Sequence, residues 1–300
     1  MSNVCQDRAG RVSTGSQRLP QFSISQVSTL TASFEDDVRT YAAGGADAIG
    51  IWEMKLDEVP DDSEALALLA ASGLGAATAV PLVPSILPLP LLPGPTDPRE
   101  RIDSLLGSIN RLAAFRPTAV VCITGPGDRT TAVAGLRELA AEAERAGMRL
   151  ALEPFQAEGL ESWSIVNTLG EAVELIDEVG SPAVGIQFDV WHLWNTPDLY
   201  DEIDRYAHRF AGVHINDWRN GTRGWADRVL PGDGVADVPA ILAALERAGW
   251  DSYYDIEIFS DNGVFGTAYP DSLWDVEPSE LVRRSRERFI QCWEERRVAA

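Results

Sequence analysis

The chain has 300 residues, of which 45% are hydrophobic and 24% are charged, as is usual for a soluble globular protein. Its formal net charge of −21 argues against a nucleic-acid partner, because a phosphate backbone needs a basic surface. The three cysteines lie far apart and form no CxxC motif, which argues against a disulfide framework or a thiolate zinc site and favours a reducing, cytoplasmic location.

Residues 1–20 are polar and contain no apolar core of the kind that secretory signals carry, so we expect a flexible lead-in to the folded domain. The stretch 82–95 is apolar, but prolines interrupt it repeatedly, whereas a membrane helix needs about 20 uninterrupted apolar residues. We therefore expect no membrane contact. We expect a proline-rich loop at 82–95 that serves as a lid or as an interface.

Eight short apolar segments alternate along the chain with longer amphipathic stretches. Near-continuous apolar strands separated by helices are typical of a parallel sheet that is buried on both faces. The expected strands are 21–28, 47–56, 75–83, 118–126, 148–155, 184–191, 210–218 and 252–260.

The intervening stretches carry sequence signals of helices. One has apolar residues at helical spacing and ends at Gly147, which can adopt the left-handed conformation that closes a helix. Thr168 and Glu171 have the spacing of a capping box, and Asp237 can cap a further helix. A last helix is expected over residues 278–296.

Eight strand–helix units without a change in composition predict a single (β/α)₈ TIM barrel over residues 21–300, which would be the catalytic domain. A doubly wound open sheet is the structural alternative. No GxGxxG motif opens a helix after the first strand, so a dinucleotide-binding form of that sheet has no support.

Four successive strands end in side chains that can bind a metal ion, namely Glu153, Asp189, His214 and Glu257. Active sites of TIM barrels form at the C-terminal strand ends. Any one of these carboxylates could instead belong to a buried ion pair or a helix cap. Four ligand-type side chains at equivalent positions favour a divalent cation, which would neutralise the three carboxylates that are costly to bury. Three carboxylates and one imidazole favour Mn²⁺, with Mg²⁺, Co²⁺ and Zn²⁺ as alternatives.

The apolar segment GIQFDVWHLW places His192 three residues after Asp189. Both side chains can reach the mouth of the barrel where the chain turns out of the strand. We assign Asp189 to the metal and His192 to a hydroxyl or carbonyl oxygen of the substrate. The alternative is that His192 orients Asp189 or a neighbouring residue. The third histidine of the chain, His208, lies in a helical segment, and we expect it to be structural.

Aromatic side chains gather near the expected mouth of the barrel, where they could stack on a sugar ring or an aglycone. Packing of loops onto the barrel is the alternative role. We assign Trp191 and Trp218 to substrate binding. The aromatic residues of this region are Trp191, Trp194, Trp218, Trp225 and Phe259.

Charged residues near the strand ends are further candidates. Arg219, Arg223 and Arg228 lie in one loop and could hold a phosphate or a carboxylate, although a neutral polyol needs no more than one of them. Glu53 and Lys55, at the end of the second strand, could contact substrate or form a solvent-exposed ion pair.

The ordered set E-P, D-x-x-H, H-x-x-D and a final E on the last four strands resembles the xylose isomerase-like sugar isomerase/epimerase superfamily. Ketose 3-epimerases, inosose dehydratases and endonuclease IV belong to that superfamily. The likeness covers residues 21–295 and is clearest in the segments LEPF, QFDVWHLW, GVHINDW, RVLPGDGVADVPAIL and YYDIEIFSD.

The resemblance implies the same four metal ligands, of which Glu153 and Glu257 would also act as the acid–base pair beside the substrate carbon. It implies that His192 and Arg228 bind substrate oxygens. Ketose 3-epimerases carry a further glutamate six residues after the first ligand, where this chain has Gly159. Endonuclease IV needs a histidine-rich site for several zinc ions, which three histidines cannot supply.

The chemistry that the resemblance implies is proton abstraction beside a carbonyl, which gives an enediolate. We therefore predict a metal-dependent isomerase or epimerase that acts on a sugar or keto-sugar. If a β-substituent leaves instead, the enzyme is a lyase or dehydratase acting on an inosose or a 3-keto-glycoside, as in C-glycoside-cleaving enzymes that pair this barrel with a partner subunit.

A non-catalytic binding subunit is the third interpretation, and the two retained glutamates argue against it. Members of the superfamily often form dimers or tetramers. We therefore expect a homo-oligomer, with a hetero-oligomer that contains a small partner subunit as the alternative.

Overall fold

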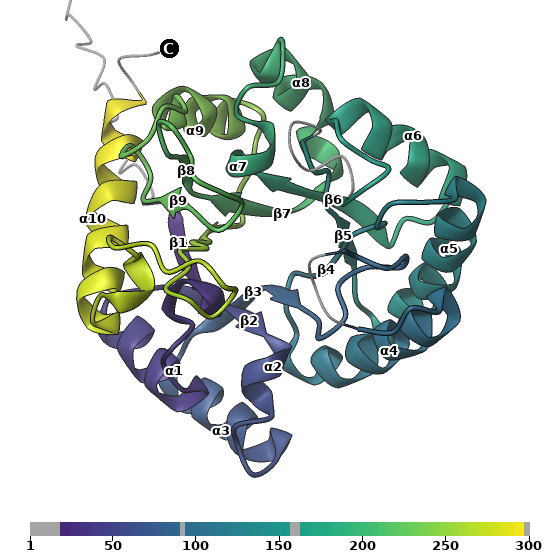
Figure 1. Ribbon diagram of the computed structural model, residues 1–300, viewed down its shortest axis with the longest axis horizontal. Helices are drawn as coiled ribbons and strands as arrows, with labels where there is room; N and C mark the ends of the chain where they lie inside the picture. Colours follow the sequence, from purple (N-terminus) through teal and green to yellow (C-terminus); the bar gives the residue numbers. More distant parts are fainter. Residues whose placement is uncertain (1–18, 91–93, 157–162, 297–300) are drawn as a thin grey trace, which may run out of the picture.

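The computed structural model describes residues 19–90, 94–156 and 163–296. Within these residues, eight parallel strands close into a barrel that is surrounded by helices (Figure 1). The order around the barrel is β1-β10-β7-β6-β5-β4-β3-β2, which follows the chain once the short β8–β9 ribbon is set aside. The predicted TIM barrel is confirmed, and the doubly wound alternative is wrong. The expected lead-in lies almost wholly outside the described residues.

Each expected strand is present but ends earlier than its apolar run. The barrel strands are β1 (Gln21–Ser25), β2 (Ala48–Trp52), β3 (Gly75–Val80), β4 (Ala119–Cys122), β5 (Leu150–Leu152), β6 (Val184–Asp189), β7 (Phe210–Ile215) and β10 (Tyr253–Ile256). Three of the runs continue into one-turn helical segments, because apolar periodicity alone does not separate a short strand from a buried turn of helix. These segments are η1 (Gln26–Thr29), α2 (Glu53–Leu56) and α7 (Val190–Leu193).

The outer helices begin and end at the residues that the capping signals indicated. Thr168 accepts a hydrogen bond from the backbone of Glu171, Asp237 accepts one from Ala240, and Gly147 has a φ of 68°. The helices are α1 (Phe34–Ala43), α3 (Asp62–Ser72), α4 (Pro98–Leu112), α5 (Arg129–Ala146), α6 (Leu169–Val179), α8 (Leu199–Tyr206), α9 (Val238–Arg247) and α10 (Pro278–Glu295). None of the described helices is both long and apolar enough to cross a membrane.

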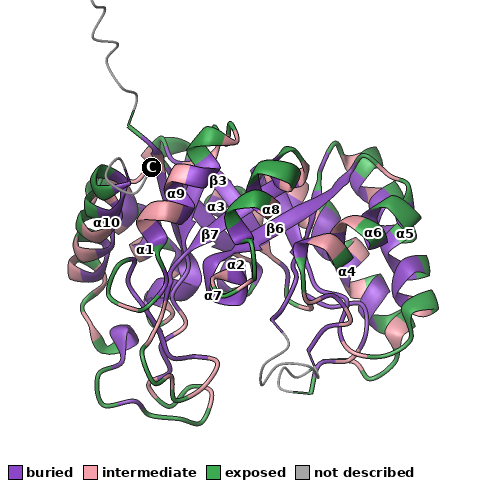
Figure 2. Ribbon diagram, turned by 90° about the horizontal axis from the view of Figure 1, so that it is seen from above, coloured by how far each residue is buried: buried purple, intermediate pink, exposed green. Residues whose placement is uncertain are grey.

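The core lies between the barrel and the helices. Figure 2 shows buried strands in the middle of the molecule and exposed residues on the outer faces of the helices. Helix α5 illustrates the pattern, since Leu136, Leu139 and Ala140 are buried against the sheet. This packing makes the strands rigid and fixes the positions of the side chains at their ends.

The proline-rich stretch is fastened to α4 by a buried arginine. The Arg101 guanidinium donates to the backbone oxygen of Ser85 at 2.9 Å, to the Ser85 hydroxyl at 2.7 Å and to the backbone oxygen of Pro95 at 2.9 Å. Both ends of the stretch are therefore held in place, and residues 91–93 lie outside the described part. Its use as a lid or an interface stays a prediction.

The expectation of a solvent-exposed ion pair at the end of β2 is wrong. The turn of helix α2 directs Lys55 inward, where its ammonium group lies 2.6 Å from the Asp37 carboxylate and 2.9 Å from the backbone oxygen of Thr29. Both charged groups are fully buried, and burial raises the pKa of Asp37 to about 6 although the Lys55 charge opposes this shift. Glu53 is also buried and accepts a hydrogen bond from the backbone of Leu82 at 2.9 Å.

We predict that Lys55→Met lowers the free energy of unfolding by about 3 kcal/mol, because it leaves a buried carboxylate without its cation. The matched control is Arg39→Met, which breaks the exposed pair with Asp36 and should cost less than about 1 kcal/mol. Denaturant unfolding measures both values.

The effect of Lys55→Met on stability should depend on pH, because the fold raises the pKa of Asp37. The folded state raises the pKa of this acid above its unfolded value, so its ionisation destabilises the fold and its protonation relieves the cost. The loss of unfolding free energy that Lys55→Met causes should therefore become smaller as the pH falls from about 7 to about 5. A loss of unfolding free energy that does not change with pH, or that equals the loss in Arg39→Met, would contradict this account.

Candidate functional site

The four expected metal ligands lie together at the C-terminal ends of their strands. Glu153 follows β5 directly, Asp189 ends β6, His214 lies in β7 and Glu257 follows β10. The register pairs Asp189 with His214 across neighbouring strands. Each of the four is at most 6% exposed. The closed parallel barrel is therefore what brings these distant residues to one place.

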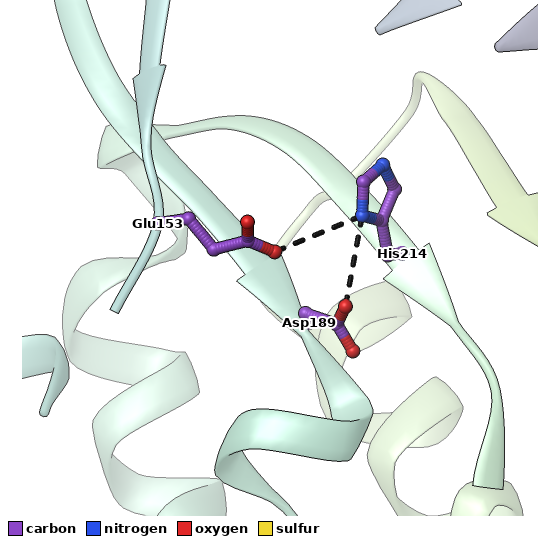
Figure 3. A group of neighbouring side chains, drawn as sticks. All are labelled: Glu153, Asp189 and His214. Atoms are coloured by element: carbon purple, nitrogen blue, oxygen red, sulfur yellow. Dashed lines mark ion pairs between the residues drawn. The ribbon is translucent and has the colours of Figure 1, made fainter. Parts of the chain in front are cut away.

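Three of these residues form a compact group, in which one atom of each lies within 4.8 Å of the others (Figure 3). The His214 Nδ1 atom lies 3.8 Å from Glu153 Oε1 and 3.7 Å from Asp189 Oδ2. It also lies 3.3 Å from Glu257 Oε2. Within the described residues Nδ1 makes no well-formed hydrogen bond, so a buried nitrogen faces three carboxylates with no partner of its own.

Arg228 is the cationic side chain that pairs with two of these carboxylates. Its Nη1 atom donates to Asp189 Oδ2 and to Glu257 Oε2, each at 2.9 Å, and its guanidinium stacks over the Trp191 and Phe259 rings. With all three carboxylates ionised and His214 neutral, the form in which all four could bind a metal ion, the Arg228 guanidinium leaves two negative charges. A divalent cation would balance that charge, and a nitrogen with three carboxylates is a donor set that Mn²⁺ and Zn²⁺ accept. The residues therefore fit a divalent metal ion.

The charges are strongly coupled through burial. Burial, and next the charge of Asp189, raise the pKa of Glu153 well above its ordinary value. Burial alone would raise the pKa of Asp189, but Arg228, together with His214 and His192, holds it below its ordinary value. Burial alone would lower the pKa of His214, but Glu257 and Asp189 together outweigh it and raise the pKa. The site as described is thus short of positive charge.

Two residues that fix the ligands were missed at the sequence level. The Asn216 side-chain amide donates to Asp189 Oδ1 at 2.9 Å and to the backbone oxygen of Glu257 at 3.2 Å. Thr78, on β3, has its hydroxyl 3.0 Å from His214 Nε2 and leaves Nδ1 to face the carboxylates. The available signals were the position of Asn216 two residues after His214, and a lone threonine in an apolar strand.

The aspartate of the H-x-x-D motif, Asp217, has a structural role. Its carboxylate accepts hydrogen bonds from the backbone of Trp218, Gly232, Gly234 and Ala236, each at 2.8 to 2.9 Å. It thereby closes the loop that carries β8 (Asp217–Trp218) and β9 (Arg228–Val229), which pair antiparallel. This loop positions Arg228 over the strand ends.

A cavity of about 540 Å³ opens beside the group, and Glu153, His192, Arg228 and Glu257 all line it. The His192 ring packs 3.9 Å from the Phe155 ring, between centroids, and burial lowers its pKa to about 3, so it is neutral. Within the described residues neither of its nitrogens has a hydrogen-bond partner. The hydrogen bonds that Asp189 accepts come from other residues, so the proposed orienting role of His192 finds no support.

The remaining sequence-level candidates are placed differently. Trp191 lines the cavity, whereas Trp218 packs 4.6 Å from Trp191, between centroids, and is not part of the lining. Arg219 and Arg223 are each paired with Asp227 and Asp271 at 2.6 to 2.9 Å, so their charges are already neutralised. Their use to hold a phosphate or a carboxylate stays a prediction. His208 is exposed, and Gly159 lies outside the described residues.

Comparisons with known proteins agree with this fold. A family model described as a xylose isomerase-like TIM barrel matches residues 38–292. The D-psicose 3-epimerase of Enterocloster bolteae is 34% identical over 172 residues, which are 55% of this chain and 53% of that protein. The inosose isomerase of Bacillus velezensis is 30% identical over 128 residues, which are 41% of this chain and 44% of that protein.

The chain thus spans about half the length of the curated relatives that it matches. Among solved structures, the IolI protein with a binding zinc atom has a TM-score of 0.74 over 92% of this chain and 98% of that chain. At 20% sequence identity, this likeness shows the shared fold.

We predict that the chain binds one Co²⁺ ion and that His214→Gln weakens this binding at least about 100-fold, because the ligand nitrogen is lost. Titration followed by the visible spectrum of Co²⁺ measures the effect. His208→Gln is the matched control, since it removes an exposed histidine and should bind as the unmodified chain does. Equal binding by both variants would contradict the assignment.

We also predict that Thr78→Val weakens Co²⁺ binding about 10-fold to 100-fold, because a hydrogen-bonded neighbour holds the ring of a ligating histidine in place. Thr78→Ser keeps the hydroxyl and should recover most of the affinity. If valine binds the ion as well as serine does, Thr78 does not position His214.

Proposed function

The chain belongs to the xylose isomerase-like TIM-barrel family, and we propose that it is a divalent-metal-dependent enzyme that isomerises or epimerises a sugar or keto-sugar. The observation that carries the proposal is the convergence of three buried carboxylates on the Nδ1 atom of His214, at the edge of a cavity. The names of the matched relatives, an epimerase and an inosose isomerase, support the same class of reaction.

Glu153, Asp189, His214 and Glu257 would hold the metal ion. We favour Mn²⁺ because oxygen donors outnumber nitrogen in this set, and the zinc atom of the IolI structure supports a divalent ion in general. When bound, such an ion polarises the substrate carbonyl and stabilises negative charge on its oxygen.

The side chains of the cavity supply the remaining chemistry. Glu153 and Glu257 both line it, so one carboxylate can remove the proton beside the carbonyl while the other returns a proton. Arg228 Nε and both nitrogens of His192 are buried with no hydrogen-bond partner in the described residues. A neutral His192 can donate one hydrogen bond and accept another, which suits a substrate hydroxyl.

The fate of the enediolate decides the product. Return of the proton to the opposite face of the same carbon gives an epimer, and return to the neighbouring carbon gives an aldose–ketose isomer. Loss of a β-substituent gives a lyase, which is the alternative reaction of the same site. A homo-oligomer, a partner subunit and a cytoplasmic location stay predictions from the sequence.

We predict that the Mn²⁺-loaded protein exchanges a carbon-bound hydrogen of its substrate with deuterium from D₂O. NMR of a panel of ketoses, inososes and keto-glycosides would detect the exchange. Glu257→Gln should slow it by at least about 100-fold, because a general base is lost. The control is Glu294→Gln, which makes the same change at an exposed position of α10 and should leave the rate unaltered.

The product spectrum separates isomerisation, epimerisation and elimination in the same experiment. Undiminished exchange in Glu257→Gln would refute its role as the base. Absence of exchange with every member of the panel would refute the proposed reaction class.

A further inference from the structure

Among the described residues that line the cavity, most polar side chains belong to the group around the strand ends. Of the 21 described residues that line it, five have a charged, imidazole or hydroxyl side chain, and four of these belong to the group around the strand ends. The fifth is Thr31. The other described lining residues are aliphatic or aromatic, and their only side-chain N–H donors are indole nitrogens, of which those of Trp52 and Trp191 are buried without a partner in the described residues. A ligand that fills the cavity therefore meets most of the hydrogen-bonding side chains around the strand ends and a largely apolar surface elsewhere.

Aromatic side chains from separate loops build the apolar part. Trp225 is central to it, because its ring lies 5.3 Å from Trp163, 5.5 Å from Phe259 and 5.1 Å from Phe265, between centroids. Trp52 joins from β2, with its ring 5.9 Å from Phe259. These contacts hold the rings in fixed positions around the cavity, so the surface is preformed for a flat apolar group.

The apolar surface continues to the solvent at the rim. Three of the six described large hydrophobic residues that are exposed line this one cavity, namely Met54, Leu82 and Val264, with exposed fractions of 46%, 49% and 60%. Concentrated exposure of this kind marks a binding site, because isolated soluble proteins expose few clustered apolar side chains. The whole protein carries a net charge of −21, so an apolar rim contrasts with a largely acidic protein.

A free sugar does not match such a cavity. Every carbon of a sugar carries an oxygen, and each hydroxyl that is buried without a partner costs about 1–3 kcal/mol. The cavity of about 540 Å³ also lies within the range of about 300–1,000 Å³ that drug-sized ligands occupy. A sugar ring at the polar end would leave the aromatic end to be filled by something apolar.

We infer that the substrate is a sugar ring linked to an aromatic aglycone, an inference that rests on the proposed function. The carbonyl of the sugar would lie at the polar end of the cavity, and the aglycone would lie among Trp163, Trp225 and Phe265. Because the aglycone occupies the anomeric carbon, the carbonyl must stand on another ring carbon. An oxidation of a ring hydroxyl must therefore supply the substrate of this enzyme.

The test compares two ligands that differ only in the aglycone. Isothermal titration of the Mn²⁺-loaded protein with phenyl and methyl β-D-glucopyranoside should give at least about tenfold tighter binding of the phenyl compound, because its ring buries additional apolar surface. Binding of neither ligand, or equal binding of both, overturns the inference.

Two matched variants locate the effect. Val264→Asp places a charge at the rim of the cavity and should abolish the preference for the phenyl compound. Val235→Asp makes the same change at an exposed valine that does not line the cavity and should keep the preference. Equal effects of the two variants would place the phenyl group elsewhere. Dissociation of a homodimer by Val264→Asp, with no phenyl preference beforehand, would overturn the inference in favour of an interface.

The inference and the proposed function fail in different ways. Deuterium exchange into free ketoses without a phenyl preference overturns the aglycone site and leaves the reaction class standing. A phenyl preference that Val264→Asp removes, without exchange into any carbonyl compound, supports the aglycone site and refutes the reaction class.

Discussion

The burial of three carboxylates around one imidazole nitrogen is the constraint on which the rest of this structure depends. When all three are ionised and His214 is neutral, a single arginine offsets part of their charge and leaves two negative charges at the strand ends. Buried carboxylates without compensation destabilise a fold, so a site of this kind is retained where a cation or a reaction requires it. The same arrangement that is costly for stability suits proton transfer beside a carbonyl.

Much of the surrounding structure serves to hold these groups. Asn216 links the side chain of Asp189 to the backbone of Glu257, and Thr78 fixes the ring of His214. Asp217 closes the loop that delivers Arg228. Glu153, Arg228 and Glu257 are nearly fully buried, which strengthens the electrostatic interactions among them. The proposed metal site and the proposed aglycone site thus lie next to each other at one end of the barrel.

The sequence predicted the barrel because eight apolar runs alternate with helical patterns, and it predicted the site because ligand-type residues end four successive strands. It did not predict the ion pairs of charged residues whose partners are distant in the chain. Lys55 was expected in solvent but pairs with Asp37 in the interior, and Arg223 pairs with Asp271 across two loops. Such pairings depend on tertiary contacts, which local periodicity does not encode. The hydrogen bonds of Asn216 and Thr78 to the expected ligands were not predicted for the same reason.

The most direct test of the account is a crystal structure of the chain grown with Mn²⁺, with anomalous diffraction recorded at the manganese edge. The account predicts one anomalous peak among Glu153, Asp189, His214 and Glu257, with the Arg228 guanidinium released from at least one of its two carboxylates. A structure without a peak at this position, in which Arg228 still bridges Asp189 and Glu257, would contradict it.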